Sequence, residues 1–189
     1  MVLNICTAGD PVLRQTARTL SNEEILSPTI QDLIKNMRET MWRALGVGLA
    51  APQVGESLQL AVLEGRPEFH KKLNEAEMKE WQSTLYDYRV LINPRIELLS
   101  SSSEVSAYEG CLSIPGFMAN VSRSQSVRVT SLNEKAEPHL IEAEDFYARV
   151  LQHEIDHLNG VLYIDRMESG TFTTIEHYKR YIAPAVSSS

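Results

Sequence analysis

The sequence predicts an α+β fold in which antiparallel β-sheets surround a central helix that carries an H-E-x-x-H motif. Patterns typical of strands occur in short groups, and two long segments have helical periodicity. The connections between strands are mostly too short for repeated βαβ crossovers, which favours antiparallel pairing. A chain of 189 residues suits one domain, residues 1–189, with a frayed tail expected at 185–189.

The composition is that of an ordinary soluble protein, with 43% hydrophobic and 23% charged residues. A formal net charge of −7 argues against a nucleic-acid-binding surface. No apolar run approaches the roughly 18 residues that a membrane-spanning helix needs, and the N-terminus lacks the features of a signal peptide. The two cysteines, Cys6 and Cys111, give no disulfide framework, which favours a reducing compartment.

The first helix is predicted in "SPTIQDLIKNMRETMWRALG", residues 27–46. Ser27 suits the N-cap and Pro28 the first helical position, because proline lacks the N–H that would be unsatisfied there. Gly46 suits the C′ position that follows many helices. The residues that recur at helical spacing are Ile30, Leu33, Ile34, Met37, Met41, Trp42 and Leu45.

Between the two helices, short apolar runs alternate with polar segments. Strands are predicted at 58–64, at 89–94 with a stop at Asn-Pro, and at 126–132 before a turn near Asn133. Residues 65–82 are polar and are expected to form an exposed loop with a helical piece. The run "SSSSE" at 100–104 is interpreted as a hairpin turn.

The second helix is expected to begin near Glu144 or Asp145 and to end at Gly160. Four of its residues follow one another at spacings of four, three and four, and so share one face: Phe146, Val150, His153 and His157. The apolar pair marks this face as the buried one. Two histidines four residues apart can bind a single metal ion, with Glu154 beside them as a proton carrier.

Two histidines leave a tetrahedral site incomplete, so a third ligand is needed. Tyr163 stands where one class of zinc peptidases has its third histidine, and a tyrosine with a pKa near 10 is a poor ligand at neutral pH. Glu168 or Glu176 would be the ligand in a second class of peptidases. Cys111 offers a thiolate and would leave the fourth position open. The alternatives for Cys111 are a buried small hydrophobe and a catalytic thiolate.

The glycine-rich stretch "GVGLAAPQVG", residues 46–55, satisfies a dinucleotide-binding pattern, but its context is wrong. It follows a helix instead of a strand, and Pro52 and Gly55 disfavour a long helix after it. We therefore interpret it as a segment whose backbone closely approaches a ligand. The amide of Gln53 could then donate to an oxyanion, and the alternative is a surface-loop residue.

Three segments, "GVGLAAPQ", "EGCLS" and "HEIDH", resemble in this order the signature of the peptide deformylases, GxGLAAxQ, EGCLS and HExDH. The resemblance covers nearly the whole chain. It implies hydrolysis of the N-formyl group of N-formylmethionyl nascent peptides, with release of formate. Residues 65–88 are longer than in compact bacterial forms, and "FMANVSRSQSV" with "RMESGTFTT" is similar to the organelle-like, type 1 branch.

The resemblance also implies the roles of individual residues. One divalent metal ion per chain would be bound by Cys111, His153 and His157. Glu154 would be the general base and acid, and Gln53 and the backbone N–H of Leu112 would form the oxyanion hole. Substrate-binding residues would be Val47, Gly48 and Gly110 along the peptide, and Phe146 and Val150 around the methionine side chain. Asp156 would anchor the helix through Arg123, and the alternative for Asp156 is an exposed carboxylate.

Fe²⁺ is the expected native metal, with Zn²⁺, Ni²⁺ or Co²⁺ as alternatives, because a thiolate ligand accepts both iron and zinc. The expected partners are N-formylmethionyl peptides and the ribosome, without a nucleic-acid motif or a membrane. The expected location is the bacterial cytoplasm, or an organelle matrix after removal of a transit peptide. Two other functions stay open: an H-E-x-x-H endopeptidase with a downstream glutamate ligand, and a non-catalytic module with a structural metal.

Overall fold

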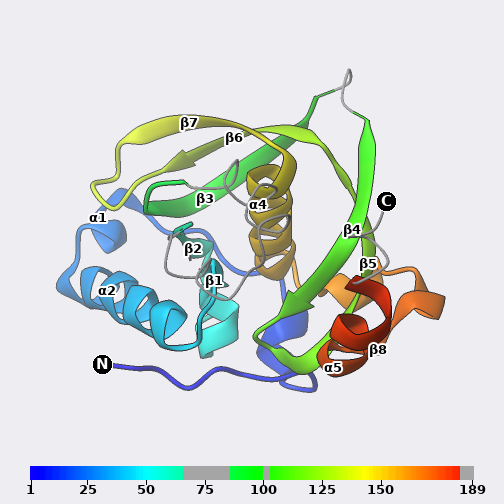
Figure 1. The fold of residues 1–189 in the computed structure, drawn as a ribbon. Coiled ribbons are helices and arrows are strands. Elements are labelled where there is room, and N and C mark those ends of the chain that lie inside the picture. The colour runs from blue at the N-terminus through cyan, green and yellow to red at the C-terminus, as the bar shows by residue number, and fades with distance from the viewer. Residues whose placement is uncertain (66–85, 100–102, 184–189) are drawn as a thin grey trace.

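Residues 1–65, 86–99 and 103–183 are described in the computed structural model of the chain (Figure 1). The larger sheet has the order β1-β2-β3-β6-β7 and the smaller one the order β4-β5-β8, and neighbouring strands are antiparallel. The prediction of helices combined with antiparallel sheets is therefore confirmed. The larger sheet consists of β1 (Gly48–Ala50), β2 (Leu60–Leu63), β3 (Arg89–Leu98), β6 (Ser126–Leu132) and β7 (Pro138–Glu144). The smaller sheet consists of β4 (Glu104–Cys111), β5 (Ile114–Ser124) and β8 (Thr173–Thr174).

The helices lie around and between these sheets (Figure 1). The described α-helices are α1 (Asn22–Ile25), α2 (Pro28–Arg43), α4 (Asp145–Leu158) and α5 (Ile175–His177), and η6 (Tyr178–Ile182) is a π-helix. The 3₁₀ turns are η1 (Pro11–Arg14), η2 (Ala51–Val54), η4 (Tyr163–Asp165) and η5 (Ser169–Thr171). Among the described helices, none combines the length and the apolar character that crossing a bilayer requires.

Helix α2 begins as predicted but ends differently. The Ser27 side chain accepts a hydrogen bond from the Ile30 N–H at 3.4 Å. The prediction that Gly46 occupies C′ is wrong, because Leu45 takes the left-handed position with φ 57°. The Gly46 N–H instead donates to the Met41 carbonyl at 2.9 Å, so Gly46 is the C″ residue of a Schellman motif whose C′ residue is Leu45.

Strand β3 does not stop at Asn-Pro as predicted. It continues past Asn93 through a bulge, where the register shifts between Ile92 and Arg95 and Asn93 has φ 51°. The Asn93 side chain accepts from the Leu20 N–H at 2.9 Å and donates to the Leu20 carbonyl at 2.8 Å. These contacts stabilise a backbone conformation that asparagine adopts more readily than most residues.

The polar segments are mostly outside the described residues. This holds for the predicted loop with a helical piece, apart from Gly65, and for residues 100–102 of the expected hairpin turn. The strands that flank this turn, β3 and β4, belong to different sheets, so the hairpin prediction is wrong. The predicted turn near Asn133 is confirmed, because its side-chain oxygen accepts from the Lys135 and Glu137 N–H groups at 2.9 Å. The expected frayed tail also lies outside the described residues.

Helix α4 has the predicted bounds within two residues, and it packs against both sheets. Its residues Ala148, Leu151, Ile155 and Leu158 form a core with Leu63, Leu91, Val127 and Val129 of the larger sheet. Burial of a leucine such as Leu151 contributes about 2 kcal/mol. On its other side α4 contacts β5. The helix is therefore fixed where a residue of the β4–β5 hairpin can meet it.

Candidate metal centre

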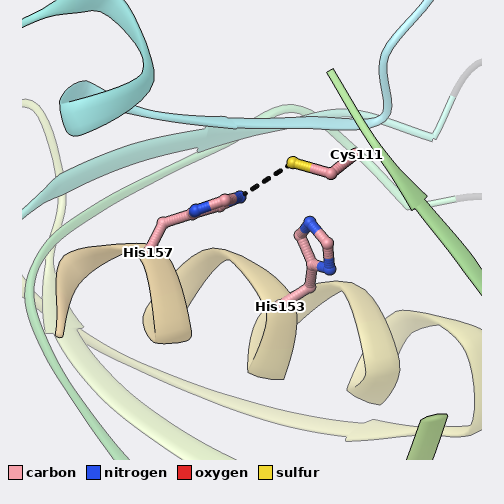
Figure 2. Close-up of side chains that lie close together, drawn as sticks. All are labelled: Cys111, His153 and His157. Carbon is pink, nitrogen blue, oxygen red and sulfur yellow. Dashed lines mark hydrogen bonds between the residues drawn. The ribbon is translucent and has the colours of Figure 1, made fainter. Parts of the chain in front are cut away.

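Three candidate ligands, separated along the chain, meet between β4 and α4. Cys111 is the last residue of β4, and His153 and His157 stand one turn apart on α4 (Figure 2). Their ligand atoms lie within 4.8 Å of one another. The Sγ atom of Cys111 is 3.3 Å from Nε2 of His157. The structure thus brings together the three residues that the resemblance implied.

The chemistry of this donor set fits a divalent transition metal. One thiolate and two imidazoles suit Zn²⁺ or Fe²⁺, whereas Mg²⁺ and Ca²⁺ prefer oxygen ligands. Burial lowers the pKa of His157 well below its usual value, which favours the neutral ring that binds metals. Three protein ligands also leave a coordination position for a reacting molecule.

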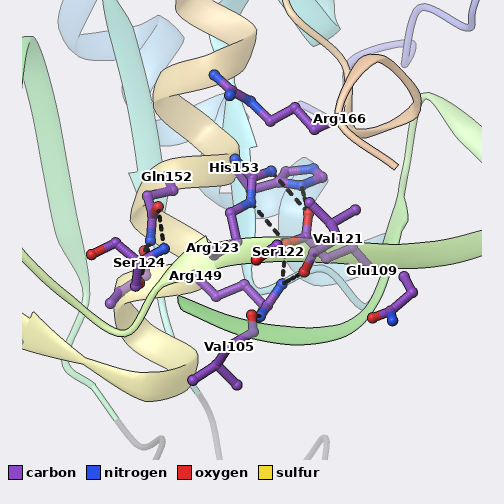
Figure 3. A network of polar contacts seen from close by, with 12 residues as sticks. Val105, Glu109, Val121, Ser122, Arg123, Ser124, Arg149, Gln152, His153 and Arg166 are labelled. Atoms are coloured by element: carbon purple, nitrogen blue, oxygen red, sulfur yellow. Dashed lines mark hydrogen bonds and ion pairs between the residues drawn. The ribbon is translucent and has the colours of Figure 1, made fainter. Parts of the chain in front are cut away.

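Glu109 orients His153, and sequence analysis missed it. Its Oε2 atom lies 3.0 Å from Nδ1 of His153, which leaves the Nε2 atom of this histidine for the metal (Figure 3). Burial opposes ionisation of Glu109, but hydrogen bonds from His153 and Arg123 outweigh it and hold the pKa of Glu109 well below its usual range. For His153, burial alone would lower the pKa. The contacts with Cys111 and Glu109 outweigh burial and raise the pKa of His153 well above its usual value.

Two buried arginines fix the Glu109 carboxylate. Arg123 donates to both of its oxygens at 2.9 and 3.0 Å, and Arg149 donates to Oε1 at 2.7 Å (Figure 3). Arg149 also donates to the Val121 carbonyl at 2.8 Å. The sequence did contain a signal for Glu109, because it is the first residue of the EGCLS segment that contains Cys111.

The predicted contact between Asp156 and Arg123 is present. Arg123 Nη1 lies 2.5 Å from Asp156 Oδ2, and Arg166 donates to both oxygens of Asp156 at 2.6 and 2.7 Å. Asp156 is only 8% exposed, so the alternative of an exposed carboxylate is wrong. Arg123 therefore connects two buried carboxylates, one on β4 and one on α4. Arg166 was not identified from the sequence.

Glu154 is buried beside the candidate ligands. It is 4% exposed, and its Oε2 atom has no hydrogen-bond partner among the described residues. Burial raises the pKa of Glu154 to about 7, although the charge of His153 acts in the opposite direction. A carboxyl group with a pKa near neutrality can both accept and return a proton.

Gln53 is a buried residue and not the surface-loop residue of the alternative interpretation. It is 2% exposed. Its Oε1 atom accepts from the Ala50 N–H at 2.9 Å, while Nε2 lies 3.2 Å from Ser113 Oγ and 3.5 Å from Cys111 Sγ. The acceptor end of the amide is thereby fixed by the backbone, and the donor end faces Cys111.

A cavity of about 550 Å³ opens onto this site. It is bounded by Cys111, His153 and Glu154 together with Gln53 and Leu112. All of the predicted substrate-binding residues line it: Val47, Gly48, Gly110, Phe146 and Val150. Other lining residues that sequence analysis missed include Leu45, Tyr108, Arg149 and Ile175.

The other candidate ligands lie elsewhere. Glu168 and Glu176 are exposed and are not part of the Cys-His-His group. Tyr163 is buried, and burial raises its pKa to about 12, which keeps the hydroxyl protonated at neutral pH. Its ring stacks at 6.4 Å from that of His153. A downstream glutamate ligand is therefore not supported by the described part of the chain.

The chain is similar to proteins of one known family. The family model described as polypeptide deformylase matches residues 2–172. The chloroplast peptide deformylase 1A of Solanum lycopersicum is 40% identical over 174 residues, which cover 92% of this chain and 62% of that protein. The peptide deformylase of Chlorobaculum parvum is 42% identical over 168 residues, which cover 89% of this chain and 81% of the relative.

A solved structure shows the same fold. The Met-Ala-Ser-bound crystal structure of a class I type b peptide deformylase from Acinetobacter baumannii superposes with a TM-score of 0.76 at 32% identity. The match covers 88% of this chain and 99% of that one. The chain spans less than two thirds of the length of the tomato relative.

Proposed function

This chain belongs to the peptide deformylase family, and from that premise we propose that it hydrolyses the N-formyl group of N-formylmethionyl nascent peptides and releases formate. One observation carries the proposal. The ligand atoms of Cys111, His153 and His157 converge within 4.8 Å, and Cys111 and His153 line a cavity together with Glu154. The Acinetobacter baumannii protein was crystallised with Met-Ala-Ser bound, the peptide that remains when formyl-Met-Ala-Ser loses its formyl group. This supports the proposed substrate class.

The proposed metal ligands are Cys111, His153 and His157. A divalent ion bound there supplies a Lewis acid and lowers the pKa of water to near neutrality. We propose Fe²⁺ as the native ion and Zn²⁺, Ni²⁺ or Co²⁺ as functional substitutes, because the thiolate and imidazole donors accept all four.

Proton transfer is assigned to Glu154. Its buried carboxylate accepts the proton of the attacking water and later returns it to the amine nitrogen of the leaving peptide. A pKa near 7 suits both steps. The same residue thus acts first as general base and then as general acid.

Two hydrogen-bond donors are proposed to stabilise the negative charge that develops on the formyl oxygen. These are Nε2 of Gln53, which lies 3.5 Å from Cys111 Sγ, and the backbone N–H of Leu112, the residue after that cysteine. One such donor contributes about 3 kcal/mol to transition-state stabilisation in comparable enzymes.

The substrate peptide is proposed to lie along Val47, Gly48 and Gly110, with the methionine side chain against Phe146 and Val150. In this proposal α4 is the central helix of a single catalytic domain, residues 1–189. The pair of Asp156 and Arg123 anchors α4 to β5. We further propose association with the ribosome. For the location we propose the bacterial cytoplasm, with an organelle matrix as the alternative, since the relatives include both bacterial and chloroplast proteins.

Formate release from formyl-Met-Ala-Ser tests the proposal. Protein loaded anaerobically with Fe²⁺, Ni²⁺ or Co²⁺ is expected to release formate, and Cys111→Ala is expected to lose both metal and activity. Glu154→Gln is expected to keep the metal and to lose activity. A wild-type protein that binds stoichiometric metal without releasing formate would overturn the proposal.

A further inference from the structure

The C-terminal unit of β8, α5 and η6 lies beside the cavity. Strand β8 pairs with β5, with Thr174 opposite Phe117 and Thr173 opposite Met118. In Figure 1, this unit is seen at the end of the β4–β5 hairpin. It lies beyond residue 172, where the match to the family model ends. It is therefore a part of this chain that the family match does not describe.

One aromatic contact attaches the C-terminal unit to the hairpin, and a second attaches Phe172, the residue directly before the unit. The rings of Phe117 and Phe172 stack with centroids 5.0 Å apart, and those of Tyr108 and Tyr178 lie 4.7 Å apart in a tilted arrangement. Aromatic pairs of this kind stabilise a contact by more than the burial of their apolar surface alone. Tyr108 also lines the cavity, so the unit is attached directly to the cavity wall.

Ile175, the first residue of α5, extends this wall. It lines the same cavity as Cys111 and Glu154, yet it is 38% exposed. Leu45 also lines the cavity and is 67% exposed, with its backbone held in the left-handed region by the end of α2. Apolar side chains that remain exposed in a cavity wall are suited to contact a ligand.

We propose that Ile175 is a specificity-determining residue, which together with Leu45 forms an outer apolar subsite for a side chain that follows the formylmethionine. The inference rests on the proposed function. If Phe146 and Val150 bind the methionine side chain, the following residues must continue along the cavity, because an extended peptide advances about 3.3 Å per residue. The subsite then favours peptides with a large apolar residue after methionine.

Peptide pairs that differ in one residue test this preference. One pair is formyl-Met-Ala-Leu and formyl-Met-Ala-Ser, and the other is formyl-Met-Leu-Ser and formyl-Met-Ser-Ser. In at least one pair the wild-type protein is expected to have the higher kcat/KM for the leucine peptide. Ile175→Ala is expected to lower this leucine-to-serine ratio about threefold, less than a fully enclosed pocket would give, because the site is partly open.

Leu98→Ala is the matched control, since Leu98 is an exposed apolar residue on β3 that does not line the cavity. It is expected to leave the ratio unchanged. A second variant, Ile175→Glu, is expected to shift the preference toward formyl-Met-Ala-Lys or formyl-Met-Lys-Ser through charge attraction. Circular dichroism checks that each variant is folded.

The outcomes separate the two proposals. A wild-type protein that hydrolyses none of these peptides would overturn the proposed function, and the subsite with it. If the wild-type protein is active, and if Ile175→Ala and Ile175→Glu both keep its leucine-to-serine ratio of kcat/KM in both peptide pairs, the subsite alone is overturned.

Discussion

Gly48 and Glu154 approach so closely that a Cβ atom on Gly48 would lie 2.2 Å from Oε1 of Glu154. Gly48→Ala must therefore displace the buried carboxylate. We expect kcat/KM for formyl-Met-Ala-Ser to fall about 100-fold, the effect of a misplacement of about 1 Å, while metal content stays at the wild-type level. Gly170→Ala is the control, because nothing lies within 4 Å of its added Cβ atom. Wild-type activity in Gly48→Ala would contradict the role of Glu154.

Glu109→Gln tests how far the orientation of His153 matters for metal binding. The variant retains the size of the side chain but removes the charge that faces His153, Arg123 and Arg149. We expect metal affinity, measured by competition with a chelator, to fall about 10- to 100-fold. Glu104→Gln, an exposed change on the same strand, is the control. Unchanged affinity in Glu109→Gln would show that His153 needs no carboxylate partner.

Arg123→Ala would leave Glu109 and Asp156 without the guanidinium that they share. Because both carboxylates are buried, we expect the free energy of unfolding in denaturant to fall by about 3–5 kcal/mol. Arg128→Ala is the contrasting change, since Arg128 pairs with Glu142 at the surface and its loss should have little effect. Equal stability of the two variants would mean that the buried network does not stabilise the fold.

Gln53→Glu keeps an oxygen that can accept from the Ala50 N–H and removes the amide donor. We expect kcat to fall about 100-fold or more with a smaller change in KM, because the lost donor acts mainly on the developing oxyanion. Steady-state formate release separates the two constants. A change confined to KM would assign Gln53 to substrate binding instead.

Local signals explain what sequence analysis predicted correctly. Ser27 and Pro28 mark the start of α2, and the bounds of α4 follow from its periodicity, because capping and amphipathic spacing act over a few residues. The Cys-His-His group was reached through motif order, since spacing alone left Cys111 and downstream glutamates as competing ligands.

The wrong predictions concern contacts between distant residues or small shifts in helix termination. The bulge at Asn93 depends on Leu20, 73 residues away, which no local pattern reports. Leu45 takes the left-handed position that Gly46 was expected to occupy, because α2 ends one residue earlier than glycine preference suggested. Arg166 was missed because its partner Asp156 belongs to α4, and Ile175 was missed because the cavity that it lines is formed mostly by residues distant in the sequence.

The placement of Cys111 on β4 and of the histidines on α4 has a consequence for how the chain folds. Cys111 and His157 are 46 positions apart, so an ion held by both acts as a cross-link that closes a large loop. Such a cross-link removes chain entropy mainly from the unfolded ensemble, and its binding free energy is added to that of folding. We therefore expect the melting temperature to rise with the free metal concentration, and a chelator to lower it, which thermal unfolding with and without added metal measures.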